Sequence, residues 1–149
     1  MSFKDNINTW IFDLDNTLYS ADSGIFQQVH KLMGEFVAKN LNMELAEAKK
    51  LQAKYYKQHG TTLRGMMDNH GVDPDYFLEE VHKLDYSIVG PNQNLNDELY
   101  KLEGRKIIYT NANKQHVLDV LEKINLTNFF DEIYDCLLYT SDAADERRR

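Results

Sequence analysis

An apolar run that ends in two closely spaced acids constrains this chain more than any other feature. Residues 10–18 read WIFDLDNTL, and the run of apolar side chains stops at Asp13. Such a run predicts a buried β-strand from about Thr9 to Asp13. Because successive strand residues point to opposite faces, we expect Asp13 and Asp15 to project to one side and Leu14 to the other.

The two acids predict a bound divalent cation and a phosphoryl-transfer reaction. Neighbouring carboxylates repel each other and are costly to bury, and a divalent cation with a preference for oxygen, such as Mg²⁺, offsets that cost. A carboxylate beside the cation can attack a phosphoryl group, and a second one can transfer the proton. The alternative is that Asp15 and Asn16 only end a strand and begin a turn. The apolar run before the acids and the Thr17-Leu18 pair after them favour the catalytic interpretation.

A second strand repeats this arrangement. Residues 106–110 read KIIYT, which predicts a buried strand that ends in Thr110 and is followed by Asn111. A hydroxyl and an amide can hold phosphate oxygens without adding negative charge, and the N-terminus of the next helix favours an anion. An ordinary strand end with Asn111 in a turn is the alternative.

The stretch between the two strands predicts helices only. No segment between Tyr19 and Tyr86 alternates as a strand does. We expect helices capped by Ser23, Asn42 and Asp73, with a loop at 61–65 that leads into a short helix. Beyond Gly90, a helix at 94–103, the second strand, a helix capped by Asn113 and a third strand from about Phe129 complete the prediction. Strands that alternate with helices indicate an α/β fold with a parallel sheet and right-handed connections.

Residues 12–19, FDLDNTLY, resemble the first motif of the haloacid dehalogenase (HAD) superfamily of phosphohydrolases. Residues 107–111 resemble its second motif. The resemblance implies a Rossmann-like parallel-sheet core with an inserted all-helical cap, and Mg²⁺ as cofactor. It assigns Asp13 as nucleophile and metal ligand, and Asp15 as acid and base with its backbone carbonyl on the metal. Thr110 and Asn111 would hold the phosphate.

Two further stretches resemble the pyrimidine 5′-nucleotidase subgroup of this superfamily. Residues 60–65 read GTTLRG and residues 82–87 read HKLDYS. The resemblance implies hydrolysis of nucleoside 5′-monophosphates, with Thr62 and Arg64 facing the substrate. The alternatives are a phosphatase of another small ester, such as a sugar phosphate, and a non-catalytic binding module. The resemblance divides the chain at 1–18 (core), 19–88 (cap) and 89–135 (core).

Composition excludes several other classes. The net charge of −7 argues against a nucleic-acid surface, and the single cysteine, Cys136, excludes an intramolecular disulfide. Without a signal peptide or a membrane-length apolar run, we expect a soluble cytoplasmic protein with no membrane partner, whose oligomeric state the sequence leaves open. The five histidines show neither an i, i+4 pair nor a zinc spacing, so we interpret them as ordinary surface or core residues.

The C-terminal segment breaks the pattern. Residues 136–149 read CLLYTSDAADERRR, and one back-translation resembles a sequencing-library adapter, so we expect this segment to be non-native. The superfamily pattern also needs a lysine and one or two acids after later strands, and nothing after Asp135 supplies them. We therefore expect the parent protein to be active and this 149-residue chain to be inactive as an enzyme.

Overall fold

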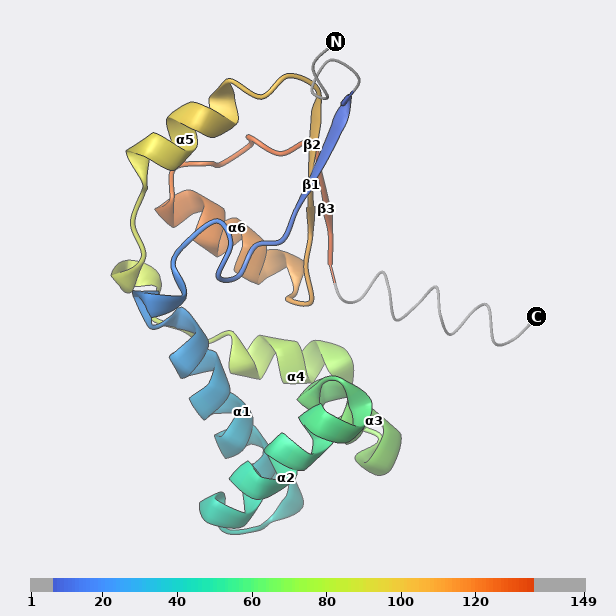
Figure 1. The fold of residues 1–149 in the computed structure, drawn as a ribbon. Coiled ribbons are helices and arrows are strands. Elements are labelled where there is room, and N and C mark those ends of the chain that lie inside the picture. Colours follow the sequence, from blue (N-terminus) through green and yellow to red (C-terminus); the bar gives the residue numbers. More distant parts are fainter. Residues whose placement is uncertain (1–6, 136–149) are drawn as a thin grey trace, which may run out of the picture. The chain divides into compact units, whose positions relative to one another are not determined.

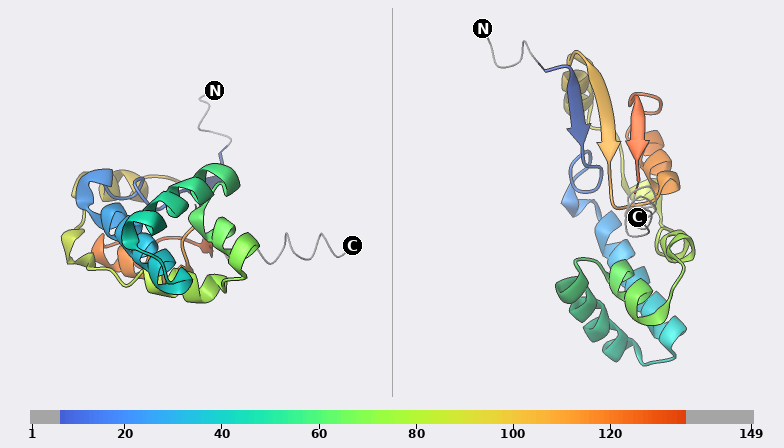
Figure 2. Two further views of the ribbon diagram at one scale, coloured as in Figure 1. Left: turned by 90° about the horizontal axis from the view of Figure 1, so that it is seen from below. Right: turned by 90° about the vertical axis from the view of Figure 1, so that its right-hand side faces the viewer.

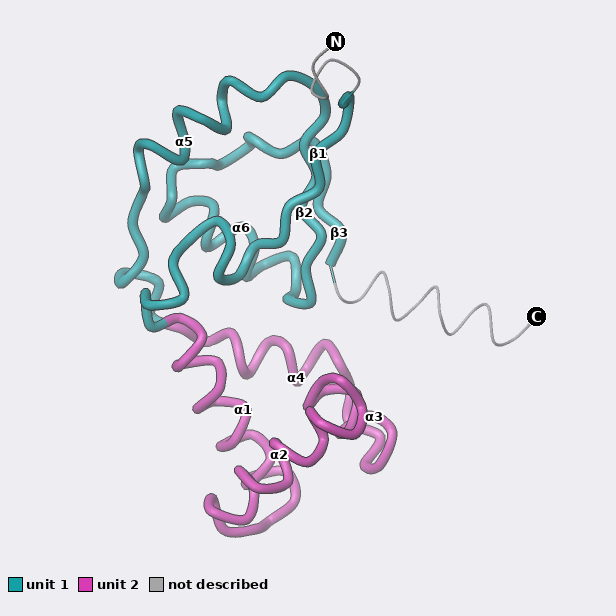
Figure 3. The backbone as a smooth tube through the Cα atoms, in the orientation of Figure 1, with its two compact units in different colours: residues 1–24, 85–149 teal, residues 25–84 magenta. Residues whose placement is uncertain are grey.

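The computed structural model describes residues 7–135, and the chain divides into two compact units. The first unit contains residues 1–24 and 85–149, and the second contains Ile25–Leu84 (Figure 3). The second unit is therefore inserted into the sequence of the first. Each helix and each strand of the described residues lies entirely within one unit.

The first unit contains a parallel sheet, as predicted. Its strands are β1 (Thr9–Phe12), β2 (Arg105–Tyr109) and β3 (Glu132–Tyr134), in the order β1-β2-β3 (Figure 1). The register pairs Phe12 with Ile108, and Ile108 with Ile133. The α/β class is thus confirmed, and the carboxyl ends of β1 and β2 lie side by side.

Helices cover one face of this sheet (Figure 1, Figure 2). They are α5 (Gln93–Tyr100) and α6 (Lys114–Lys123). Leu14 and Ile108 are completely buried, whereas Ile11 on the opposite face is 70% exposed. Short 3₁₀ turns stand near the two points where the chain passes between the units: η2 (Ala21–Ser23) and η3 (Tyr86–Ile88).

The second unit, described in full by the structure, is all helical, as predicted. Its helices are α1 (Ile25–Leu41), α2 (Leu45–His59), α3 (Thr62–His70) and α4 (Pro74–Val81). Phe36 and Phe77 pack edge to face in its core, with ring centroids 4.8 Å apart. Helix α4 begins where the sequence predicts, because the Asp73 side chain accepts a hydrogen bond from the Tyr76 amide at 2.9 Å and Pro74 follows the cap.

Several predicted boundaries are wrong. Ser23 lies in η2, and α1 begins at Ile25, after Gly24 with φ +94°. Asn42 has φ +50°, and α2 begins three residues later, after Glu44. The predicted loop at 61–65 is mostly helix, since the Thr61 hydroxyl accepts the Arg64 amide hydrogen bond and starts α3 at the next residue.

The remaining differences are smaller. Helix α5 ends at Tyr100, before the predicted Glu103, and β3 begins at Glu132, after the predicted Phe129. No helix within residues 7–135 has both the length and the hydropathy that a membrane span needs. Residues 136–149, which the sequence predicts to be non-native, lie outside the described residues.

Candidate active site

The ends of β1 and β2 form a small pocket. Its volume is about 260 Å³ and its lining residues are Ile11, Asp13, Tyr109, Thr110 and Asn111. The parallel register explains this, because Phe12 pairs with Ile108, so that the residues following each strand emerge at the same edge. The structure therefore brings together three of the predicted site residues: one carboxylate, one hydroxyl and one amide.

Asp13 is accessible from solvent in this pocket. Its Oδ1 accepts a hydrogen bond of 2.8 Å from the backbone amide of Leu14. The Leu14 side chain is completely buried. The buried Leu14 anchors the backbone directly after the acid, and the amide contact restricts the carboxylate. An exposed and restrained carboxylate of this kind can act as a nucleophile or as a metal ligand.

Thr110 is 96% buried, in contrast to Asp13, and its position is fixed on two sides. Its amide donates to the Tyr134 carbonyl at 3.0 Å, and its Oγ1 accepts from the Ala112 amide at 3.2 Å. Since the described contacts use the hydroxyl oxygen as an acceptor, the hydroxyl hydrogen is the part left to donate to an anion.

Two backbone amides in the first turn of α6 donate to side chains of the chain itself. The Asn113 side chain accepts from the His116 amide at 2.9 Å, which confirms the predicted cap. The Asp135 side chain accepts from the Lys114 amide at 3.1 Å. Two amides of this helix N-terminus are therefore already paired with side chains of the chain itself, which leaves fewer donors for a phosphate.

Asp15 is not among the residues that line the pocket of Asp13. Its Oδ1 accepts a hydrogen bond of 2.5 Å from the Tyr19 hydroxyl and lies 2.7 Å from the Nε2 atom of His116. The Nδ1 atom of the same ring lies 2.7 Å from the Tyr86 hydroxyl. The Asp15 side chain remains 29% exposed, so it is held from one side and is accessible from the other.

His116, Tyr19 and Tyr86 are the residues that the sequence did not assign to this site. The sequence predicts His116 to be an ordinary residue because it lies outside any metal-binding spacing. Its partner Asp15 is 101 positions earlier in the chain, and only the packing of α6 against the sheet brings the two together. Tyr19 and Tyr86 belong to stretches that resemble the family, and no local pattern places either hydroxyl.

Thr62 and Arg64 lie in the helical unit, where both side chains already have partners. The Thr62 side chain is 96% buried, and its hydroxyl donates to the Gln52 carbonyl at 3.4 Å. The Arg64 guanidinium lies 3.0 Å from the Asp68 carboxylate, one helical turn away. A substrate contact by Arg64 would have to compete with this ion pair.

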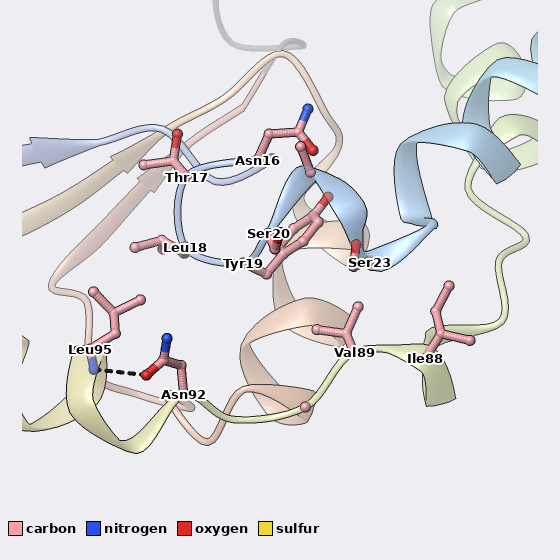
Figure 4. Close-up of a pocket in the computed structure, with 12 residues that line it drawn as sticks. Asn16, Thr17, Leu18, Tyr19, Ser20, Ser23, Ile88, Val89, Asn92 and Leu95 are labelled. Carbon is pink, nitrogen blue, oxygen red and sulfur yellow. Dashed lines mark hydrogen bonds between the residues drawn. The ribbon is translucent and has the colours of Figure 1, made fainter.

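A larger pocket, of about 520 Å³, also lies in the first unit (Figure 4). Asn16, Tyr19, Ser20 and Asn92 supply polar groups to it, and no carboxylate lines it. The Asn92 side chain accepts from the Leu95 amide at 3.1 Å, the contact drawn in Figure 4, and this caps α5. The larger pocket lacks a carboxylate that could act on a substrate, whereas the smaller one contains Asp13. We therefore take the smaller pocket as the candidate active site.

The pocket supplies one carboxylate that could bind Mg²⁺. Within the described residues, no group of three or more histidine, cysteine or acidic side chains could hold a metal. Mg²⁺, however, is commonly held by one or two carboxylates together with substrate phosphate and water. The Asp13 carboxylate, which lines the pocket, is a ligand of this kind, whereas the Asp15 side-chain Oδ1 is already bound by Tyr19 and His116.

Comparison with known proteins agrees with this geometry. The sequence profile of the haloacid dehalogenase-like hydrolases matches residues 10–140. Phosphate metabolism protein 8 of Saccharomyces cerevisiae is 25% identical to this chain over 139 residues, which cover 85% of this chain and 43% of the yeast protein. The chain therefore spans less than half the length of this curated relative.

Proposed function

Because this chain belongs to the haloacid dehalogenase-like hydrolase family, we propose that it carries the nucleophile and the acid–base group of a phosphohydrolase. The observation that supports the proposal is the shared pocket of Asp13 and Thr110. The proposed substrate is a nucleoside 5′-monophosphate, preferably with a pyrimidine base. Since the chain spans under half of its relative, we assign the activity to an extended protein, in which the gene's own continuation replaces residues 136–149.

The proposed reaction proceeds in two steps. In the first, a carboxylate oxygen of Asp13 attacks phosphorus, the bond to the substrate's ester oxygen breaks, and Asp15 gives that oxygen its proton. In the second, water attacks the aspartyl phosphate and passes a proton to Asp15. The Asp13–phosphate bond then breaks and releases inorganic phosphate. The hydroxyl of Thr110 and the amide of Asn111 donate hydrogen bonds to the phosphoryl oxygens.

Magnesium would neutralise charge on the phosphoryl oxygens when bound. The Asp13 carboxylate and the Asp15 backbone carbonyl are the proposed protein ligands in this chain. A lysine and further acids from the continuation would complete the electrostatic environment, which supplies most of the catalysis in phosphoryl transfer. For that reason we propose that the 149-residue chain does not turn over substrate.

Hydrolysis assays on both proteins test this proposal. We expect the extended protein to hydrolyse UMP and CMP with Mg²⁺, faster than it hydrolyses a hexose phosphate, and the 149-residue chain to hydrolyse none of them. Asp13→Asn should abolish turnover because the amide is a far weaker nucleophile. Asp75→Asn, at an exposed acid of the helical unit, is the matched control and should retain activity.

Each other outcome contradicts a specific part of the proposal. Equal or faster turnover of the hexose phosphate would remove the nucleotide preference but keep the phosphatase. Turnover by the Asp13→Asn protein would remove the covalent mechanism. Tight phosphate binding without turnover by the extended protein would identify a non-catalytic binding module. A role for Arg64 in the choice of leaving group stays a prediction, and Arg64→Ala should then change the ratio of UMP to hexose phosphate turnover.

A further inference from the structure

His116 is a buried polar residue with a partner on each side of its ring. It is 99% buried in the first turn of α6. Its Nε2 atom lies 2.7 Å from Oδ1 of Asp15, and its Nδ1 atom lies 2.7 Å from the Tyr86 hydroxyl. A buried imidazole that is hydrogen-bonded at both nitrogens has one ring orientation, and it restricts the orientation of the side chains bonded to it.

The chemistry of the three groups gives the chain of hydrogen bonds a direction. Oδ1 of Asp15 acts as an acceptor toward the Tyr19 hydroxyl, so we assign Nε2–H of His116 as a donor to that oxygen as well. In the neutral ring Nδ1 is then an acceptor, and the Tyr86 hydroxyl donates to it. Tyr86 thereby selects the tautomer that presents a donor to Asp15. Tyr19 adds a second donor to the same carboxylate oxygen.

We propose that His116 is a positioning residue that fixes the orientation of the Asp15 carboxylate for proton transfer, with Tyr86 fixing the tautomer of the ring. This inference rests on the proposed function, in which Asp15 protonates the leaving oxygen. A general acid must come within about 3 Å of the atom it protonates, so a carboxylate free to rotate spends less time in the productive position. The contacts at Oδ1 hold the group, and its partial exposure keeps it accessible to a substrate.

Two substitutions of similar size separate positioning from general stability. The side-chain amide of glutamine can place a donor near the position of Nε2, and that of asparagine near the position of Nδ1. His116→Gln therefore retains a donor for Asp15, whereas His116→Asn loses it and retains the contact with Tyr86. Both variants remove the buried ring, so a merely structural role would affect them alike.

The readout is the dependence on leaving group in the extended protein. UMP releases an alkoxide that needs a proton, whereas p-nitrophenyl phosphate releases a stable phenolate that does not. His116→Asn should lower kcat for UMP by about 10- to 100-fold, which is a part of the rate enhancement that a general acid contributes. The same substitution should change kcat for p-nitrophenyl phosphate by less than about 3-fold. His116→Gln should recover most of the UMP activity, and Tyr86→Phe should show a weaker form of the same selective loss.

Nitrogen NMR of the His116 ring in the 149-residue chain provides a readout that does not depend on activity. We expect the tautomer protonated at Nε2, with the assignment made by comparison with His116→Gln. Equal losses for both substrates, or a ring protonated at Nδ1 alone, would overturn the positioning role. If the unmodified extended protein hydrolyses neither substrate, the proposed function fails, and the NMR result still decides whether the ring donates to Asp15.

Discussion

At the scale of single residues, Thr110 shows how one buried hydroxyl combines a structural and a chemical task. Its oxygen accepts the hydrogen bond of the Ala112 amide, which fixes the turn after β2. Its hydrogen is not used by that contact, and the residue lines the pocket of Asp13. Removal of the hydroxyl should therefore affect the binding of an anion more than the removal of the neighbouring methyl group does.

Thr110→Val and Thr110→Ser test this in the extended protein. A hydrogen bond to a charged group contributes about 1.5–3 kcal/mol, so the valine variant should bind inorganic phosphate about 10- to 100-fold more weakly. The serine variant keeps the donor and should bind phosphate nearly as the parent does. Competitive inhibition by phosphate measures both, and unchanged phosphate binding by the valine variant would show that the hydroxyl does not bind the anion.

The buried phenol of Tyr19 should make the folded chain lose stability at alkaline pH. Burial raises the pKa of this phenol above its ordinary value of 10.0, and the neighbouring Asp15 charge raises this pKa further. Below pH 10 both folded and unfolded chains keep the proton, and the stabilisation is complete. Above it the unfolded chain loses the proton while the folded chain retains it, so stability falls as pH rises, by up to about 1.4 kcal/mol per pH unit.

Tyr19→Phe should remove that contribution to the pH dependence, because phenylalanine does not ionise. We expect the variant to be less stable at neutral pH, where it lacks the hydrogen bond to Asp15, and to lose stability less steeply above about pH 10. Urea unfolding of the 149-residue chain across this range gives both values. Tyr56→Phe, at a tyrosine that is 67% exposed, controls for the loss of a hydroxyl in general. A slope identical to that of the parent would contradict the prediction.

Sequence could locate some residues of the site and not others. Asp13 and Thr110 each follow an apolar run directly, and the parallel arrangement of two such runs is enough to place both at one edge. His116 has no such local pattern. Its position depends on how α6 packs against the sheet, and a one-dimensional pattern does not contain that information.

At the scale of helices, α2 and α3 approach each other closely at Gly65. A Cβ atom at this position would lie 2.4 Å from both Cβ and Cγ of Tyr55, which is well inside van der Waals contact. Tyr55 is buried and its hydroxyl lies 2.6 Å from Nε2 of His70, so the ring cannot easily move aside. The absence of a side chain at Gly65 therefore sets the distance between the two helices.

Gly65→Ala should destabilise the helical unit. Overpacking of this kind costs about 1–3 kcal/mol, and the better helix propensity of alanine returns at most about 1 kcal/mol. Urea unfolding of the 149-residue chain, followed by helical circular dichroism, measures the net change. Gly90→Ala is the matched control, because a Cβ there meets no atom within 4 Å. Equal stability of the two variants would show that the helices separate without cost.

The helix boundaries show where local patterns suffice. Asp73 and Asn113 cap their helices as predicted, because each side chain bonds an amide three residues later and needs no distant partner. Ser23 and Asn42 offer the same side-chain chemistry, but neither directly precedes the first residue of a helix. The chain adopts a left-handed conformation at Gly24 and at Asn42 itself, and those backbone turns decide where α1 and α2 begin.

At the scale of the whole molecule, the periodicity of the sequence predicts the class of fold well. Apolar runs give the strands, amphipathic spacing gives the helices, and their alternation gives a parallel sheet. The pattern of the strands does not, however, show which face of the sheet is covered. Within the described residues, α5 and α6 cover one face, and Ile11, Tyr109 and Tyr134 on the other are 70%, 48% and 39% exposed.

This exposed face and the edge of β1 predict self-association of the 149-residue chain. In the described part of the sheet β1 pairs with β2 alone, so its other edge presents backbone groups that a second strand can bind. Ile11→Lys places a charge in the middle of that strand and should lower the weight-average mass measured by light scattering at high protein concentration. Leu118→Lys, at an apolar residue of α6 that is 44% exposed, is the control and should leave association unchanged. Loss of association in both variants would indicate general charge repulsion, and loss in neither would show that β1 is not the contact.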